Sequence, residues 1–155
     1  MLRYACVMES LYILRLAKEL QRELNKLRSE LYALCPDPSF YALEPCIILG
    51  STDEIESNAH IPCPELPLTC ERELRYSHHH LHIPVDDAAL SPLRKALGIS
   101  YPYSGIYLAD VEIQRTIEPV IIKDLWFALL TIHEEGALKL WRVSSEKHLD
   151  SGKGR

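Results

Sequence analysis

The stretch that decides the fold is Tyr103-Ser104-Gly105-Ile106-Tyr107-Leu108-Ala109-Asp110-Val111. Its apolar middle predicts a strand from Ile106 to Ile113. A similar stretch occurs earlier, Leu43-Glu44-Pro45-Cys46-Ile47-Ile48-Leu49-Gly50, and its wholly apolar run from Cys46 to Leu49 predicts a buried strand. We expect these two strands to lie side by side at the centre of a two-lobed fold.

The size and composition of the chain are those of one globular domain. With 155 residues it can bury a core of its own, and 47% hydrophobic with 25% charged residues is ordinary for a globular protein. A net charge of -5 argues against strong nonspecific binding to nucleic acid, because such binding depends on Lys and Arg neutralising phosphates.

Three further features of the sequence bear on the location of the protein in the cell. No stretch reaches the roughly 18 uninterrupted apolar residues of a membrane span, so we expect no membrane partner. The first ten residues lack the pattern of a secretory signal. None of the five cysteines forms a C-x-x-C pair, which favours reduced thiols and a cytoplasmic location: Cys6, Cys35, Cys46, Cys63 and Cys70.

The N-terminal part predicts a short strand followed by a long helix. Apolar and polar residues alternate from Leu2 to Val7, and Ser10 can cap a helix that Pro36 stops. We expect one stripe of that helix to pack on the sheet of the same domain, with a homodimer through this helix, residues 13–34, as the alternative. The stripe consists of Ile13, Ala17, Leu20, Leu24, Leu27, Leu31 and Leu34.

Loops and a hairpin fill the middle of the chain. Residues 36–45 contain three prolines and predict an extended approach to the first central strand, and the polar residues 51–65 predict a loop with one helical turn at 53–57. Loose alternation from Leu66 to Ser77 and a return from His80 to Val85 predict a hairpin that turns near residues 77–79.

A short helix and a second hairpin complete the order. Asp86 and Asp87 can cap the helix, Gly98 ends it, and Pro92 moves its regular part to Ser91. The apolar run 125–132 predicts a strand, although a helix over 123–133 fits the same pattern, and 138–143 predicts the last strand. The sequence thus predicts one two-lobed α+β domain over residues 1–146 and a flexible tail over 147–155.

In this order of elements and in its apolar runs the chain resembles the 2′-5′ RNA ligase-like family, also called the two-histidine phosphoesterases. The resemblance spans nearly the whole chain and includes the stretches Leu43 to Gly50, Leu81 to Asp86, Tyr103 to Val111 and Trp141 to Val143. It implies a bilobal α+β fold with two antiparallel sheets related by pseudo-symmetry. Each lobe of that family carries one motif, His, apolar, Thr or Ser, apolar, and the two histidines act together on cyclic or 2′-5′ phosphodiesters.

Carried over position by position, the resemblance puts Cys46 and Ile48 at the first histidine and hydroxyl, and Gly105 and Tyr107 at the second pair. The chemical half of both motifs is therefore missing, since glycine cannot move a proton and isoleucine cannot hydrogen-bond a phosphate. Ligand contacts remain available to Tyr107 and, with a slip of one residue in register, to Ser104. Cys46 has a thiol, but one that is mostly protonated at neutral pH unless a cation lies near.

A histidine cluster near the predicted hairpin turn invites a metal hypothesis. On a strand, His78, His80 and His82 would share one face, and Cys70 on the partner strand would complete a set of ligands suited to zinc. The spacing matches no established zinc motif, and histidines exposed on a turn are the simpler interpretation.

Three functions are open at this point. The first is a non-catalytic relative of this fold that binds a small ligand, an RNA end or a protein partner in or near the cleft between the lobes. The second is an active phosphodiesterase on 2′,3′-cyclic or 2′-5′ phosphodiesters with a site rebuilt around His78, His80 or His82, and the third is a structural or oligomeric role through the 13–34 helix. No cofactor is expected, since neither G-x-G-x-x-G nor G-x-x-x-x-G-K occurs.

Overall fold

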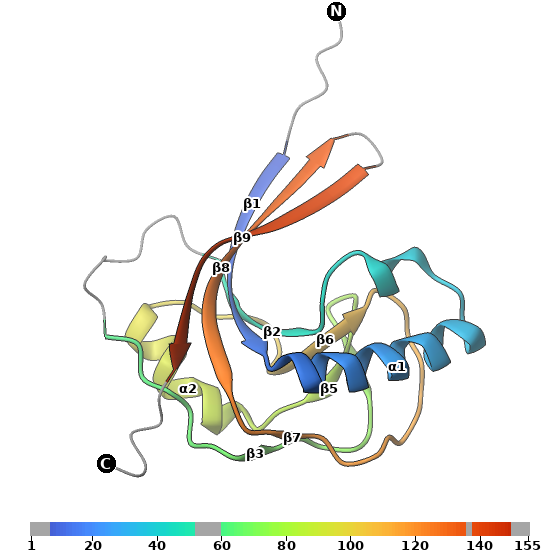
Figure 1. Cartoon of the computed structure of the whole chain (residues 1–155), viewed down its shortest axis with the longest axis horizontal. Helices are drawn as coiled ribbons and strands as arrows, with labels where there is room; N and C mark the ends of the chain where they lie inside the picture. The colour runs from blue at the N-terminus through green and yellow to red at the C-terminus, as the bar shows by residue number, and fades with distance from the viewer. Residues whose placement is uncertain (1–6, 52–59, 136–137, 150–155) are drawn as a thin grey trace, which may run out of the picture.

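The computed structural model describes residues 7–51, 60–135 and 138–149 (Figure 1). A seven-stranded sheet with the strand order β4-β5-β6-β2-β1-β8-β9 forms its centre, and β3 and β7 form a separate pair. The elements are β1 (Val7–Leu16), α1 (Lys18–Leu34), the 3-10 helix η1 (Pro38–Tyr41), β2 (Cys46–Gly50), β3 (Leu68–Thr69), β4 (Arg75–Ser77), β5 (His80–Pro84), α2 (Asp87–Leu97), β6 (Gly105–Ala109), β7 (Ile121–Ile122), β8 (Leu125–Glu135) and β9 (Leu138–Leu149).

The pairing of the two central strands is confirmed. β2 and β6 run antiparallel, with Cys46 opposite Tyr107 and Ile47 opposite Ile106. β2 is the middle strand of the seven, because β1 pairs along its other edge. The α+β class is also confirmed, but the large sheet is continuous across β6, β2 and β1, where two sheets had been expected.

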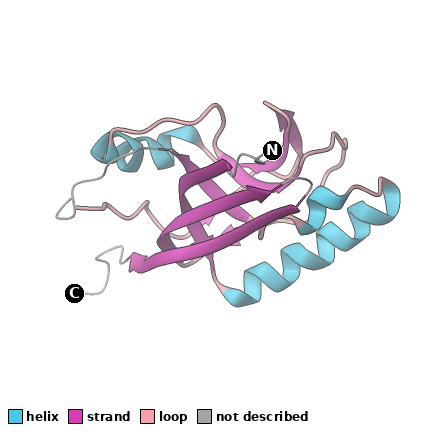
Figure 2. Cartoon of the chain, turned by 90° about the horizontal axis from the view of Figure 1, so that it is seen from above, coloured by secondary structure: helices cyan, strands magenta, loops and turns pink. Residues whose placement is uncertain are grey.

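The two faces of the sheet have different cover. One, the helix face, carries Ile47, Leu49, Ile106 and Leu108 and packs against apolar residues of both helices, among them Leu24, Leu31, Leu90 and Leu93. The other, which we call the motif face, forms a second apolar cluster from Leu11, Ile13, Cys46, Ile48, Tyr107, Ala128, Leu130 and Ile132. α1 and α2 lie at opposite ends of the central strands (Figures 1 and 2).

The long strand β1 corrects the prediction for the N-terminal part. Residues 10–16 belong to a strand that pairs with β8 along its whole length, and the helix begins only at Lys18. Ile13 lies on the motif face and Leu14 on the helix face, so this segment is apolar on both faces and its spacing fits a strand as well as a helix. Ala17, without a side-chain hydrogen bond, takes the capping position expected for Ser10.

The leucine stripe of α1 packs on the sheet of its own domain, as predicted. Leu24 and Leu31 are 2% and 0% exposed, while Leu34 at the end of the helix is 65% exposed. The leucines that suggested a dimer surface are therefore largely used inside the domain.

The second helix also begins earlier than predicted. It starts at Asp87, and the Asp86 carboxylate accepts a hydrogen bond from the Ala88 N–H at 3.1 Å, which fixes the first turn. Pro92 lies within the helix and not at its start. Gly98 ends the helix in the left-handed conformation, as expected.

Five further predictions meet different outcomes. The hairpin turn falls at His78 and His79, and residues 125–132 are strand and not helix, both as first expected. β6 ends at Ala109 and not at residue 113, and residues 36–45 contain a 3-10 helix. β9 continues to Leu149, so residues 147–149 are paired sheet and not tail. The expected strand at 2–6, the turn at 53–57 and the tail at 150–155 lie outside the described residues.

None of the described helices is both long enough and apolar enough to cross a bilayer.

Candidate functional site

Three of the four motif positions lie buried together on the motif face. Cys46 is 0%, Ile48 2% and Tyr107 4% exposed, and all three belong to the same apolar cluster. Antiparallel pairing brings them together, because Cys46 and Tyr107 are direct cross-strand neighbours. The alternation predicted from the sequence, with Ile47 and Ile106 on the opposite face, is confirmed.

The thiol at the first position is poorly suited to nucleophilic chemistry. Burial raises the pKa of Cys46 well above its ordinary value, and the nearby Glu44 carboxylate raises it further. The opposing influence of Arg28 and Arg15 is smaller. Because the thiolate is the reactive form, the raised pKa disfavours nucleophilic chemistry at Cys46 at neutral pH.

The fourth motif position is filled from the neighbouring strand. A Cβ atom added to Gly105 would lie 2.5 Å from Cδ2 of His82 and 2.6 Å from the carbonyl oxygen of Ile83. The His82 ring also stacks on Tyr103 with 4.0 Å between ring centroids. A side chain at position 105 therefore has no room unless β5 moves.

His82 is buried, and its surroundings favour the neutral form of the imidazole ring. It is 3% exposed, and burial lowers its pKa. Its Nδ1 lies 3.2 Å from the backbone carbonyl oxygen of His80, so this nitrogen carries the proton and donates. The ring thus serves mainly to fill the space over Gly105.

Tyr107 ends in a polar cluster with Asp110 and His80. Its hydroxyl donates to Asp110 Oδ1 at 2.8 Å, and His80 Nε2 lies 3.7 Å from the same oxygen. His80 Nδ1 and the Tyr103 hydroxyl are 2.9 Å apart and share a hydrogen bond. The Asp110 N–H donates to the hydroxyl of Ser39 at 2.8 Å, which ties the cluster to η1.

This cluster forms the polar wall of a cavity of about 120 Å³ on the motif face. His80, Tyr107, Asp110 and Tyr101 contribute its polar atoms, and no Lys or Arg lines it among the described residues. Apolar residues form the remaining lining: Leu11, Ala42, Leu43, Ile48, Ile132 and Trp141. The lining suits one planar or apolar group that can also hydrogen-bond at its edge.

The residues proposed as metal ligands do not converge. His78 lies on the turn with positive φ and hydrogen-bonds Ser77, while His80 and His82 both contact the ring of Tyr103. Cys70 is 4% exposed in the core of the helix face. Across the described parts of the chain, no three His, Cys, Asp or Glu side chains are grouped closely enough to hold a metal ion.

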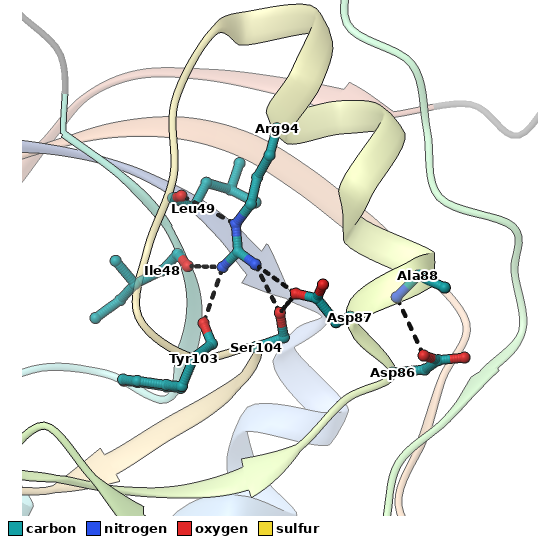
Figure 3. A network of polar contacts seen from close by, with 8 residues as sticks. All are labelled: Ile48, Leu49, Asp86, Asp87, Ala88, Arg94, Tyr103 and Ser104. Atoms are coloured by element: carbon teal, nitrogen blue, oxygen red, sulfur yellow. Dashed lines mark hydrogen bonds and ion pairs between the residues drawn. The ribbon is translucent and has the colours of Figure 1, made fainter.

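Ser104 belongs to a network centred on the buried side chain of Arg94 (Figure 3). The Arg94 guanidinium donates to the carbonyl oxygens of Ile48, Leu49 and Tyr103 at 2.9–3.1 Å, and to the Ser104 hydroxyl at 2.6 Å. That hydroxyl donates in turn to Asp87 at 2.6 Å. The network joins α2 to the ends of both central strands, so Ser104 has a structural partner on each side.

Comparison with known proteins rests on structure, since no protein-family model and no curated protein matches the chain. E. coli LigT in its apo form matches with a TM-score of 0.61 over 92% of this chain and 97% of its own, at 13% identity. The chain has a LigT-like fold. LigT complexed with 3'-AMP matches with a TM-score of 0.60 over the same shares of each chain, again at 13% identity.

TT0787 of Thermus thermophilus has the same fold, with a TM-score of 0.55 over 94% of this chain and 99% of its own, at 13% identity. The likeness therefore extends over nearly all of the chain. Such low identity supports the fold alone.

Sequence reasoning missed three residues of this region: Asp110, Trp141 and Arg28. Asp110 and Trp141 line the cavity, and Arg28 is buried on α1 at 3% exposure. Arg28 could have been noticed, because it follows Leu24 by four positions and precedes Leu31 by three, which puts a charged residue on the apolar stripe. The approach of His80 to Asp110 has no comparable signal in the sequence.

Proposed function

We propose that this chain is a non-catalytic form of the LigT-like fold that binds a small ligand on the motif face. The observation that carries the proposal is the filled space at Gly105, where the His82 ring and the Ile83 carbonyl occupy the place of a second catalytic side chain. At the first motif position the buried Cys46 thiol offers no ready base. With both positions unsuited to proton transfer, recognition is the function that the remaining groups support.

The cavity supports a ligand that presents one ring-sized group. Its volume of about 120 Å³ is smaller than the roughly 300–1,000 Å³ of pockets that enclose a whole drug-sized molecule. Trp141, Tyr101 and Tyr107 offer aromatic surface, and Asp110 can accept a hydrogen bond from a ring N–H or amino group. LigT was crystallised with 3'-AMP, so 3′-AMP is a suitable first probe.

We also propose that the two motif strands are related by a local two-fold axis between Ile47 and Ile106, as the resemblance implies. The antiparallel register supports this relation, since Cys46 lies opposite Tyr107 and the same register continued by one residue sets Ile48 opposite Gly105. A cytoplasmic location completes the proposal, in keeping with the free thiols of Cys35, Cys46, Cys63 and Cys70.

Trp141 gives a direct test of binding. The chain has two tryptophans, so Trp126→Phe leaves the fluorescence of Trp141 as a reporter inside the cavity. In that background we expect 3′-AMP to change the fluorescence in a saturable way. Ala42→Leu, which fills the cavity wall, should abolish the change, whereas Ala96→Leu on the exposed side of α2 should preserve it. Binding that survives Ala42→Leu would place the ligand elsewhere and contradict the proposal.

A second candidate, a phosphodiesterase with a rebuilt site, is favoured by one observation. His80 faces the cavity and has both ring nitrogens near polar partners, Tyr103 and Asp110, as a general base requires. Among the described residues that line the cavity His80 is the only histidine, and Leu11, Ile48 and Ile132 have no group that transfers a proton. Hydrolysis of a phosphodiester by the wild type that disappears in His80→Phe would favour this candidate over the first.

A further inference from the structure

A second hollow of the molecule lies beside β4 and β5, outside the cavity of the motif face. It has a volume of about 950 Å³ and is lined by residues of both strands, by the start of α2 and by the segment that leads into β6. His82 is one of its lining residues, and we call the hollow the His82 groove. Among the described residues only Tyr101 lines both this groove and the motif-face cavity, so the groove is a separate candidate site.

One ring nitrogen of His82 is an unused hydrogen-bond acceptor. The residue is 3% exposed, and its Nδ1 donates to the carbonyl oxygen of His80 at 3.2 Å, so Nε2 keeps a lone pair. Nε2 has no partner in the described parts of the chain. Among these residues only Arg28 has side-chain nitrogens that are both fully buried and unpartnered, so Nε2 of His82 reaches the surface. The groove is the hollow that His82 lines, and the buried ring therefore presents one acceptor to it.

The surroundings of His82 keep this acceptor available at neutral pH. Burial lowers the pKa of His82 below its ordinary value, and Arg75, which lies opposite His82 on β4, lowers it further. The hydrogen bond to the His80 carbonyl acts in the other direction and is outweighed by burial. Because the neutral ring has its proton on Nδ1, Nε2 accepts hydrogen bonds and does not donate them. A ligand that pairs with Nε2 must therefore bring the hydrogen.

The charged side chains along the groove leave it negative. Those that line it are Glu71, Arg75, Asp86 and Asp87. Arg75 Nη2 lies 3.4 Å from Glu71 Oε1, so these two charges offset each other, and Asp87 is shared with Arg94. The exposed carboxylate of Asp86 accepts a single backbone N–H and has no ion pair among the described residues, and it lies apart from the Arg94 guanidinium (Figure 3). Asp86 thus gives the groove a negative charge that no cation of the described chain balances.

Aromatic side chains form the rest of the wall around His82. Tyr76, Tyr101 and Tyr103 all line the groove, and Tyr76 is 37% exposed. One face of the Tyr103 ring is covered by the stacked His82 ring. The face of a tyrosine ring attracts cations, and a planar guanidinium also stacks on it. The groove therefore combines acceptors, negative charge and aromatic surface.

Two other classes of ligand fit these groups less well. An anion would lie near the carboxylates of Asp86 and Asp87, which repel it. A metal ion would need further ligands close to His82, and the described residues hold no group of three His, Cys, Asp or Glu side chains that could bind one. A cation that brings several N–H donors meets neither objection.

We propose that the His82 groove binds the guanidinium group of a ligand, with an N–H donating to Nε2 of His82 and the charge balanced by Asp86. A guanidinium has five N–H donors and no acceptor, which matches a wall that offers acceptors. It is also planar and weakly hydrated, which suits the tyrosine rings better than a compact ammonium group does. The inference goes beyond the proposed function and does not depend on it, because neither His82 nor Asp86 lines the motif-face cavity.

The first test compares three probes on the wild type by titration calorimetry at neutral pH and low salt: N-acetyl-arginine amide, N-acetyl-citrulline amide and methylguanidine. Citrulline has a neutral urea group in place of the guanidinium, with a similar shape, so it isolates the effect of the charge. We expect the arginine amide to bind about tenfold more tightly than the citrulline amide. Methylguanidine that binds as tightly as the arginine amide would indicate a free guanidine as the natural ligand, and weaker binding would indicate an arginine side chain of a peptide.

The second test uses two variants of the groove and one control. His82→Phe keeps a ring on Tyr103 but removes the acceptor, and it should weaken binding of the arginine amide by about tenfold. Asp86→Asn removes the charge but can still cap α2, and it should weaken binding by about threefold. Glu112→Gln makes the same change in net charge at an exposed position outside the groove, and it should bind as the wild type does.

Three results would overturn the inference. The first is that neither guanidinium compound binds the wild type, or that the citrulline amide binds as tightly as the arginine amide. The second is an affinity for the arginine amide that is unchanged in a folded His82→Phe protein. The third is an equal loss of affinity in Asp86→Asn and Glu112→Gln, which would assign the effect to net charge and not to the groove. Circular dichroism shows whether His82→Phe folds, and if it does not, the comparison of Asp86→Asn with Glu112→Gln decides.

Discussion

The imidazole of His82 occupies the space that a side chain at Gly105 would need. Cδ2 of the ring would lie 2.5 Å from a Cβ atom at position 105, and the backbone oxygen of Ile83 would lie at 2.6 Å. The two residues are on neighbouring strands, and the histidine ring is held by its stack on Tyr103. The glycine at position 105 and the close packing of β5 against β6 are thus one structural fact.

This contact predicts that Gly105→Ala is destabilising. The added methyl group would overpack the interface, at a cost of ~1–3 kcal/mol in the free energy of unfolding. His82→Ala should recover part of that cost in the double variant, since the ring is one of the two clashing groups. Gly98→Ala is the matched control, because nothing lies within 4 Å of its Cβ position. Its cost in free energy should come from backbone strain and should be the same with and without His82→Ala. Urea unfolding gives the free energy of unfolding of each variant. A Gly105→Ala protein as stable as the wild type would contradict the geometry.

The Arg94 network predicts a large effect for Arg94→Met. The substitution removes donors from the carbonyl oxygens of Ile48, Leu49 and Tyr103, and each hydrogen bond to a charged group contributes roughly 1.5–3 kcal/mol. We expect the free energy of unfolding to fall by ~3 kcal/mol or more. Asp87→Asn should cost less than about 1 kcal/mol, because the Asp87 side chain is 83% exposed. Equal effects of the two substitutions in chemical denaturation would show that the carbonyl contacts contribute little.

The Cys46 thiol should resist alkylation in the native protein. Its pKa is raised by burial and the side chain is 0% exposed, so both the thiolate and access to it are lacking. Cys70, whose pKa burial raises to about 12, should behave alike, whereas the partly exposed Cys35 and Cys63 should react before both. Mass spectrometry after brief iodoacetamide treatment, with and without guanidinium, gives the order. Labelling of Cys46 as fast as Cys35 would show that the motif face opens readily.

His82 should make stability depend on pH. Burial lowers its pKa in the folded protein below the value of about 6.5 in the unfolded chain, so the unfolded state binds a proton first as pH falls. The stability is therefore fully present above about pH 6.5 and is lost as pH falls from there through the lowered pKa. The free energy of unfolding of the wild type, compared between about pH 7.5 and pH 5, should fall more than that of His82→Phe, which keeps a ring on Tyr103 but cannot titrate. An equal fall in the free energy of unfolding of both proteins would exclude His82 as the cause of the pH dependence.

The centre of the fold could be predicted because its signals are local. The apolar runs around Ile47 and Ile106 are short and unbroken, which predicts buried strands, and every residue of β2 and β6 is buried. The boundary between β1 and α1 could not be predicted from the sequence. Residues 10–16 carry apolar side chains on both faces, and Ile13 continues the spacing of the α1 leucines. Long-range pairing with β8 decides between helix and strand there, and a single segment does not contain that information.

The candidate site also has a part that the sequence predicts and a part that it does not. Burial of Cys46, Ile48 and Tyr107 on one face follows from alternation alone. The meeting of His80 with Asp110 depends on the irregular pairing between Leu81 and His82, and the filling of Gly105 depends on a ring from another strand. Such contacts arise from register and packing across strands, so residue types and spacing do not reveal them.

The absence of catalysis is the central claim, and turnover of a nucleoside 2′,3′-cyclic phosphate by the purified protein tests it most directly. We predict no hydrolysis above a protein-free blank, because Gly105 has no side chain and the Cys46 thiol is buried. Hydrolysis that is present in the wild type and abolished by Cys46→Ala or Tyr107→Phe would contradict the account.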